Sequence, residues 1–383
     1  MLIKYIIINY MTKYDNWQIM RNLCFINNTG TPETTVPLPS YDEMRSFARF
    51  CSLDSGIADD ILNDYHALSA DRELTEYYNL IRSVMFSGQK FIDVDSRLNF
   101  ELAPEKITRI AKPGRFQLLC ALSAYGHAEE NFKKAAFPFS AFKEGAVDLA
   151  VHARQYRDNF DENGLSWNSL CWWGNLVRGT VIRQGRLEFN TSMSFFENLS
   201  AWQNKNDASV EVRKDDLPIG KEWENILKKG DPVIYIHIPA GEPLRLEDSA
   251  ASLRRIIDFF REHIPSYPYK AIVSTSWLLD TQFQSILSPD SNLVKIQKLL
   301  RIHPSTLEGC DTIERVFGVN GVRNGIDSVP LRTGMQKAFA EFLKSGGTFR
   351  SGVMFLFPEE TEKYLTAFSN TNQIRSECNH VGQ

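Results

Sequence analysis

The stretch "DPVIYIHIPAGEPLRLEDSAASLRRIIDFFREHIPSYPYKAIVSTSW", residues 231–277, decides the fold. Its two apolar ends, 233–238 and 269–277, are rich in the β-branched and aromatic residues that favour strands. The segment between them is amphipathic, and its apolar residues recur at helical spacing, namely Leu253, Ile256, Ile257, Phe260 and Ile264. The pattern predicts a strand–helix–strand unit with a right-handed crossover.

Further strands and helices are predicted on both sides of this unit. Strand-like runs are "GRLEFN" (185–190), "ASVEVRK" (208–214), "TIERVFG" (312–318) and "TFRSGVMFLF" (348–357). Amphipathic helices are expected at 291–300 and 333–347, and the second ends at a Gly-Gly pair. Strands and helices do not alternate strictly, so we expect a mixed sheet with helices, in an α/β or α+β arrangement.

The preceding part of the chain has helical periodicity from Tyr41 to about Asn163. The segments 71–86, 114–126 and 140–160 carry it, and only "KFIDV" (90–94) resembles a strand. We therefore predict an all-α N-terminal domain at 40–163 and a second domain at 164–360. Residues 1–39 are expected to be a leader or linker with a possible mis-assigned start codon, and residues 361–383 a polar tail.

Composition excludes several classes of protein. A chain of 383 residues suggests two domains, and a net charge of -4 without a basic block argues against nucleic-acid binding. The apolar N-terminus "MLIKYIIINYM" is too short to cross a bilayer and lacks a signal-peptide cleavage site, so no membrane partner is expected. Six scattered cysteines indicate reduced thiols in a cytoplasmic protein, and seven dispersed histidines argue against a metal site.

Several segments occur in an order that resembles a known family. They are "GRLEFN", "IHIPAGEPL", "DSAASLRRIIDFF", "STSWLLD", "SNLVKIQKLL" and "MQKAFAEFLKSGGTFRSG". Together they are similar to bacterial acyltransferase-domain proteins that pair a helical N-terminal domain with a GNAT-like C-terminal domain. The similarity extends over about residues 40–357.

This resemblance implies an N-acyltransferase that moves an acyl group from acetyl-CoA or another acyl-CoA to an amine of a small molecule or peptide. In GNAT enzymes two parallel strands splay apart, and the pantetheine arm lies between them. By order of elements, 233–238 and 270–277 would be those strands. Ile236 and Ile238 would then contact the arm, and the helix after Gly241, with Arg245 and Ser249, would face the pyrophosphate.

The sequence departs from the family's (Q/R)-x-x-G-x-(G/A) loop. Gly241 stands alone between prolines, and Glu247 and Asp248 lie where the helix should begin, so that ordinary helix capping competes with phosphate binding. Arg245 is the nearby cation expected to compensate.

Candidate chemical groups each have a structural alternative. His237 is a candidate general base or a hydrogen-bonded core histidine. Asp280, after the second strand, is a candidate catalytic group or a turn cap. Ser276, Trp277 and Asn292 are candidate substrate contacts. Their structural alternatives are, in the same order, an ordinary strand serine, a core tryptophan and a residue at a helix-capping position.

One glutamate and three tryptophans also have both a functional and a structural interpretation. Glu188 is expected to face solvent, with an alternative role as base. Trp167, Trp172 and Trp173 are expected to pack in a core or domain contact, with an acyl or sugar platform as the alternative.

Two competing functions remain. A catalytically silent module that binds a ligand or partner would have lost the phosphate loop; it predicts Asp248 or Ser249 as a helix cap and no gap between the strands. A hydrolase would need His237 and Asp280 to meet beside Ser274, Thr275 or Ser276, but the G-x-S-x-G motif is missing.

Overall fold

The computed structural model describes residues 36–88, 113–194, 199–214, 219–308 and 310–366. By contacts the chain divides into two compact units, Met1–Arg183 and Gln184–Gln383. The domain limits predicted from the sequence stay a prediction. The suggested strand at 90–94 and the suggested leader up to residue 35 lie outside the described residues.

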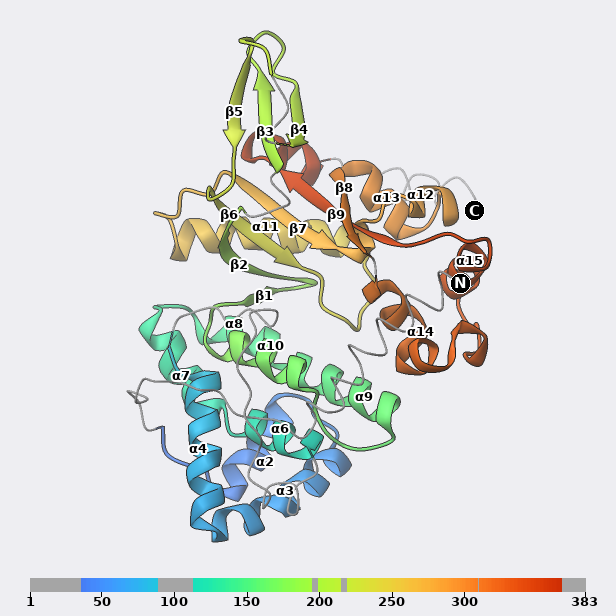
Figure 1. Ribbon diagram of the computed structural model, residues 1–383. Coiled ribbons are helices and arrows are strands. Elements are labelled where there is room, and N and C mark those ends of the chain that lie inside the picture. The colour runs from blue at the N-terminus through green and yellow to red at the C-terminus, as the bar shows by residue number, and fades with distance from the viewer. Residues whose placement is uncertain (1–35, 89–112, 195–198, 215–218, 309, 367–383) are drawn as a thin grey trace, which may run out of the picture. The chain divides into compact units, whose positions relative to one another are not determined.

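The described part of the first unit is helical from Tyr41 to Val177, as the sequence predicts (Figure 1). Its helices are α2 (Tyr41–Phe50), α3 (Ser55–Ala70), α4 (Arg72–Phe86), α6 (Pro113–Leu122), α7 (Tyr125–Lys134), α8 (Phe139–Ala146), α9 (Asp148–Phe160) and α10 (Trp167–Val177). Helix starts follow local chemistry, since Ser40, Asp54, Asp71 and Ser166 each cap a helix through the side chain. Trp173 of α10 is fully buried and packs against Phe47 and Phe142.

Buried charge is a second feature of this unit. Asp148, the first residue of α9, is 2% exposed and forms an ion pair with Arg183. A carboxylate removed from water in this way is stable only if its charge is compensated. The pair therefore joins the start of α9 to the end of the unit.

The second unit is built on a six-stranded sheet of order β1-β2-β6-β7-β9-β8. Its strands are β1 (Ile182–Gln184), β2 (Leu187–Met193), β6 (Pro232–His237), β7 (Ala271–Ser276), β8 (Arg301–Glu308) and β9 (Arg350–Leu356). β6 and β7 are parallel, while β2–β6, β7–β9 and β8–β9 are antiparallel. Helix α11 (Leu246–His263) makes the crossover, so the predicted strand–helix–strand unit and mixed sheet are confirmed.

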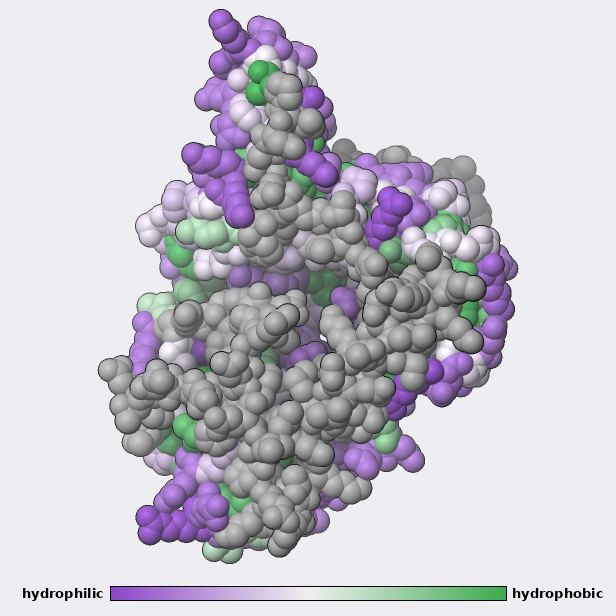
Figure 2. All heavy atoms as spheres, viewed as in Figure 1, coloured by the Kyte–Doolittle hydropathy of each residue, from purple (hydrophilic) through white to green (hydrophobic). Residues whose placement is uncertain are grey.

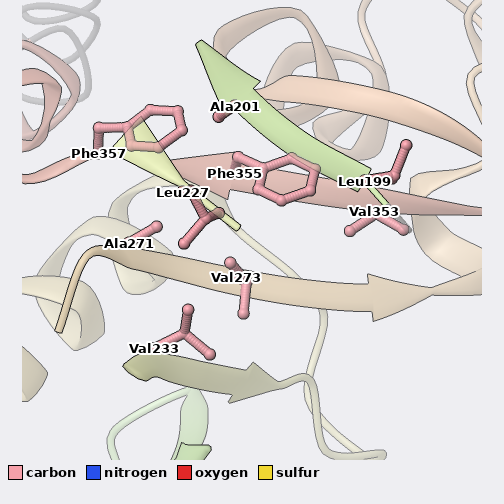
Figure 3. Close-up of a cluster of buried hydrophobic side chains, with 9 residues drawn as sticks. All are labelled: Leu199, Ala201, Leu227, Val233, Ala271, Val273, Val353, Phe355 and Phe357. Atoms are coloured by element: carbon pink, nitrogen blue, oxygen red, sulfur yellow. The ribbon is translucent and has the colours of Figure 1, made fainter. Parts of the chain in front are cut away.

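A second sheet of order β4-β3-β5 forms an arm that extends from this sheet (Figure 1). Its strands are β3 (Leu199–Asn204), β4 (Val210–Lys214) and β5 (Trp223–Leu227). The base of the arm joins the main sheet through one buried apolar cluster (Figure 3), which comprises Leu199, Ala201, Leu227, Val233, Ala271, Val273, Val353, Phe355 and Phe357. The outer part of the arm shows mainly hydrophilic side chains (Figure 2).

Helices at the other end of the unit pack around a second apolar cluster that includes Phe283, Phe317, Phe339 and Phe349. They are α12 (Phe283–Ile286), α13 (Asn292–Leu299), α14 (Cys310–Asn324) and α15 (Gly334–Lys344), with short 3₁₀ turns η2 (Trp277–Leu279) and η3 (Ile326–Ser328). The strand predicted at 312–318 is wrong, because this segment is part of α14. Its short apolar spacing fits either structure, and packing of Phe317 in the cluster favours the helix.

We predict that Asp148→Ala destabilises the first unit by about 3 kcal/mol, because the Arg183 guanidinium would lose the carboxylate that compensates its buried charge. Urea unfolding followed by far-UV circular dichroism measures this loss. The double variant Asp148→Ala/Arg183→Met should recover part of it. A loss below about 0.5 kcal/mol, the range of ordinary surface substitutions, would contradict the assigned role of the pair.

Candidate functional site

The parallel strands β6 and β7 pair over only part of their length. Three residue pairs form the ladder, Val233–Ala271, Ile234–Ile272 and Tyr235–Val273. Both strands continue beyond it, β6 to His237 and β7 to Ser276, without further pairing to each other. The two strands therefore separate at their carboxyl ends, the edge of an α/β sheet at which ligands usually bind.

Strand registers place a set of polar side chains on one face of the sheet beside this separation. Residues directly opposite each other in an antiparallel pair point to the same face. Glu188 is opposite His237, and Asn190 is opposite Tyr235. Tyr235 and His237 alternate along β6, and their rings lie 4.7 Å apart between centroids. The four side chains thus share the face that carries the base of the arm.

The hydrogen bond between His237 and Asn190 defines the state of the imidazole. His237 Nε2 lies 2.6 Å from Asn190 Oδ1, and Asn190 Nδ2 donates to the carbonyl of Thr191. Because the amide nitrogen is used as a donor there, Oδ1 is the acceptor for His237 and Nε2 carries the proton. This assignment puts the basic lone pair of the neutral ring on Nδ1.

Burial keeps this histidine neutral. Loss of solvation lowers the pKa of His237 to about 3, since burial penalises the charged imidazolium. The ring is therefore in its base form at any pH near neutrality. The hydrogen bond to Asn190 fits the reading of a core histidine, and a pKa this low makes the ring a weak base, so its role as general base stays a prediction.

Glu188 differs from its expected position. Strand alternation predicted a solvent-facing side chain, but the residue is only 1% exposed, so that prediction is wrong. Alternation predicts one buried and one exposed face only when one face of the sheet is open to water. Here both faces of β2 are covered, and Phe189 on the other face packs on Phe259 and Phe260 of α11.

The loop between β6 and α11 has its own support. Gly241 has φ of 106°, which favours glycine because a side chain would be strained there. Arg186, at the start of β2, donates from Nη1 to Pro239 O at 2.7 Å and from Nε to Pro243 O at 3.4 Å. One guanidinium therefore holds both ends of the loop. Local sequence patterns do not indicate this role, since the donor is more than 50 residues away.

The start of α11 also differs from expectation. Arg245 occupies the N-cap position, and no side chain in the described part of the chain forms a capping hydrogen bond there. Ser249 donates its hydroxyl to Arg245 O, so it does not act as an N-cap acceptor. The predicted capping by Glu247, Asp248 or Ser249 is therefore wrong. The first amides of an 18-residue helix are left without a side-chain cap, while Glu247 and Asp248 place negative charge in the first turn.

Asp280 has a dense set of hydrogen bonds and is 2% exposed. It accepts bonds from the backbone N–H of Gln282 at 3.0 Å, the backbone N–H of Arg350 at 2.8 Å and the Gln282 side chain. These bonds tie the turn after β7 to the start of β9, on the opposite side of β7 from β6. These bonds are the ones expected if Asp280 stabilises a turn. The catalytic role of Asp280 stays a prediction.

The remaining candidates are spread over the surroundings of β7. Ser276 accepts a hydrogen bond from the Leu278 N–H and so caps η2. Trp277 packs against the apolar cluster of Phe283, and Asn292 is exposed as the first residue of α13, whose cap is Ser291. The Ile236 side chain is buried on the opposite face of the sheet from Tyr235 and His237, so a ligand between the strands could reach only its backbone. Ile238 lies just beyond β6 and is partly buried. Their roles in binding stay predictions.

Metal ligation and membrane crossing are two further properties of the described residues. Among the residues that the structure describes, no cluster of three or more histidine, cysteine, aspartate or glutamate side chains could hold a metal ion. None of the helices in the described part of the chain combines the length and apolarity needed to cross a bilayer.

We predict that His237 makes the protein acid-sensitive. Unfolded histidine binds a proton below its ordinary pKa of about 6.5, whereas folded His237 does so only near 3. The unfolded state thus binds more protons in this window, and stability is lost as the pH falls through it. His237→Gln should lose less stability between pH 7 and pH 5 in urea unfolding, by about 2 kcal/mol. Identical pH dependence of variant and wild type would contradict the burial of a neutral ring.

Comparison with known proteins gives a consistent fold. Residues 181–356 match the family model of the GNAT-like C-terminal domain. No curated protein matches the sequence. Among solved structures, an acyltransferase in complex with decanoyl-CoA is similar at 23% identity and a TM-score of 0.62, over 86% of this chain and 92% of that one.

Two more solved structures match over 91% of this chain and 94% of theirs, each at a TM-score of 0.65. One is an acyltransferase in complex with CoA and 10C-teicoplanin, 21% identical, and the other is an acyltransferase mutant in complex with octanoyl-CoA, 20% identical. The chain therefore has the fold of these acyltransferases, with a helical N-terminal part followed by a GNAT-like C-terminal domain.

Proposed function

We propose that this protein is an acyl-CoA-dependent N-acyltransferase. The observation that carries the proposal is the separation of β6 and β7 after Tyr235 and Val273, with His237 on the face beside it. A gap between two parallel strands offers unpaired backbone groups to an extended ligand with amide groups, and the pantetheine arm of CoA is such a ligand. The fold shared with acyltransferases supports the same chemistry.

The reaction would join an amine to the acyl carbon. The amine nitrogen attacks the thioester carbonyl, a C–N bond forms, the C–S bond breaks, and CoA leaves as the thiol after taking up a proton. His237 Nδ1 is the candidate to take the proton from the attacking amine, because its lone pair is assigned by the bond from Nε2 to Asn190. Glu188, buried opposite His237, is the second candidate for this role.

The pyrophosphate of CoA would lie at the start of α11. The helix offers amides without a side-chain cap, and its dipole favours an anion there. Glu247 and Asp248 oppose that attraction, so Arg245 is the candidate counter-charge in place of the family's glycine-rich loop. Gly241 and Ser249 remain candidate contacts beside it.

We infer that the acceptor is an amine on a small molecule. One of the similar acyltransferases was solved with decanoyl-CoA and teicoplanin, a glycopeptide, which supports an acceptor of this size. Ser276, Trp277 and Asn292 stay the proposed substrate contacts, with Asp280 as the further catalytic candidate. A cytoplasmic location is proposed on the same grounds as in the sequence analysis.

The alternative is a silent binding module that has lost the phosphate loop. It predicts a side-chain cap on α11 and no gap between the strands, but no described residue caps α11 and the β6–β7 ladder ends early. The acidic first turn of α11 is the observation that still favours it. The hydrolase has less support, because the bonds of Asp280 go to Gln282 and Arg350.

We predict that the wild-type protein binds CoA and acyl-CoA. Calorimetric titration with CoA, acetyl-CoA, butyryl-CoA, octanoyl-CoA and decanoyl-CoA should give a dissociation constant in the micromolar range for at least one of them, as befits a working enzyme. Adenosine 3′,5′-bisphosphate serves as a control that lacks the pantetheine arm and should bind more weakly. Absence of binding to all five at millimolar concentration would refute the proposed function.

We predict that His237→Ala lowers kcat/KM by about 10²- to 10⁴-fold, the usual effect of a general base. Thiol release from the bound acyl-CoA, with amino sugars and peptide amines as acceptors, measures the rate. CoA affinity should change little, because the imidazole would act on the amine. The matched control is His263→Gln, since His263 is the last residue of α11. Equal rates of the two variants would exclude His237 as the base and turn attention to Glu188.

A further inference from the structure

The hydroxyl of Tyr235 occupies the gap between the separated strands. It accepts a hydrogen bond from the backbone N–H of Thr275 at 3.0 Å and lies 3.4 Å from the carbonyl oxygen of the same residue. In a parallel ladder these two groups of one residue would both bond to the neighbouring strand. The phenol thus satisfies a backbone position that strand pairing leaves open.

A second observation concerns the side chain of Thr275. It is two residues after Val273, the residue that pairs with Tyr235, and therefore lies on the same face as the phenol. Its Oγ1 atom is buried and has no hydrogen-bond partner among the described residues. A buried hydroxyl without a partner costs stability unless a ligand or water satisfies it. The position therefore has a hydrogen-bonding capacity that the protein alone does not fill.

We infer that the Tyr235 hydroxyl occupies the hydrogen-bonding position on the Thr275 backbone that the pantetheine arm takes when it binds. Binding of the arm then displaces the hydroxyl from Thr275. An amide of the arm has the N–H and C=O needed to replace the phenol at the Thr275 backbone, and Oγ1 is placed to bond the same ligand. This inference rests on the proposed function, because it names the ligand as CoA.

The phenol lies beside the reacting centre proposed above. Its ring packs on His237 at 4.7 Å between centroids and on the apolar cluster at the base of the arm of β3, β4 and β5. The phenol oxygen lies on the axis about which the ring turns, so release of the bond to Thr275 requires the whole side chain to swing about its Cα–Cβ bond. The Tyr235 hydroxyl competes with the ligand for the Thr275 backbone. The stronger its hydrogen bond to Thr275, the more it weakens ligand binding.

The test compares Tyr235→Phe with a matched control. Tyr267→Phe removes another partly buried hydroxyl, which donates to the carbonyls of Ser192 at 2.7 Å and Val233 at 3.0 Å, at the opposite end of β6. Both variants should lower the melting temperature by a few degrees, because each loses hydrogen bonds to strand backbone. Calorimetric titration of wild type and both variants with CoA then measures the affinity.

Tyr235→Phe should bind CoA about 3- to 10-fold more tightly than wild type, since the Thr275 N–H then has no competitor for the ligand. Tyr267→Phe should bind like wild type. Equal or weaker binding by Tyr235→Phe, with wild type binding CoA, refutes the competition between the Tyr235 hydroxyl and CoA and leaves the proposed function intact. Binding by Tyr235→Phe where wild type shows none supports it. No binding by any of the three proteins overturns both.

Discussion

The early end of the β6–β7 ladder is the constraint on which the rest of the site depends. Two adjacent parallel strands in a sheet normally continue their hydrogen bonds, because unpaired buried backbone groups are costly. Here the pairing stops at Tyr235 and Val273 while both strands continue. The remaining backbone groups need other partners, and Tyr235 supplies one of them. An extended amide-bearing ligand, as proposed above, would supply partners for backbone groups beside the gap.

The surroundings hold the gap in position from three directions. Asp280 ties the end of β7 to β9 through the Arg350 amide, and Arg186 holds the loop that follows β6. On the sheet face, the apolar cluster of the arm packs against Val233 and Val273, where the ladder is still intact. These contacts fix both strands on either side of the gap. They position the site without being part of the chemistry.

Local patterns predicted the fold well, and contacts between distant residues limited the rest. The strand–helix–strand unit was readable because its periodicities change within 47 residues from period 2 to period 3.6 and back. The segment 312–318 was misread because a short apolar run fits both a strand and a buried helix. Glu188 was placed in solvent because alternation does not reveal whether the second face of a strand is covered. Arg186 and Tyr235 were missed as site residues because their partners are distant along the chain.

A crystal structure with a bound non-reactive acyl-CoA analogue, such as the thioether, tests the central claim most directly. The pantetheine arm should lie between residues 233–238 and 272–277, with an amide on the Thr275 backbone, the reacting carbon near His237 Nδ1 and the pyrophosphate at the start of α11. An analogue bound elsewhere, with Tyr235 still bonded to Thr275 and the gap unoccupied, would contradict it.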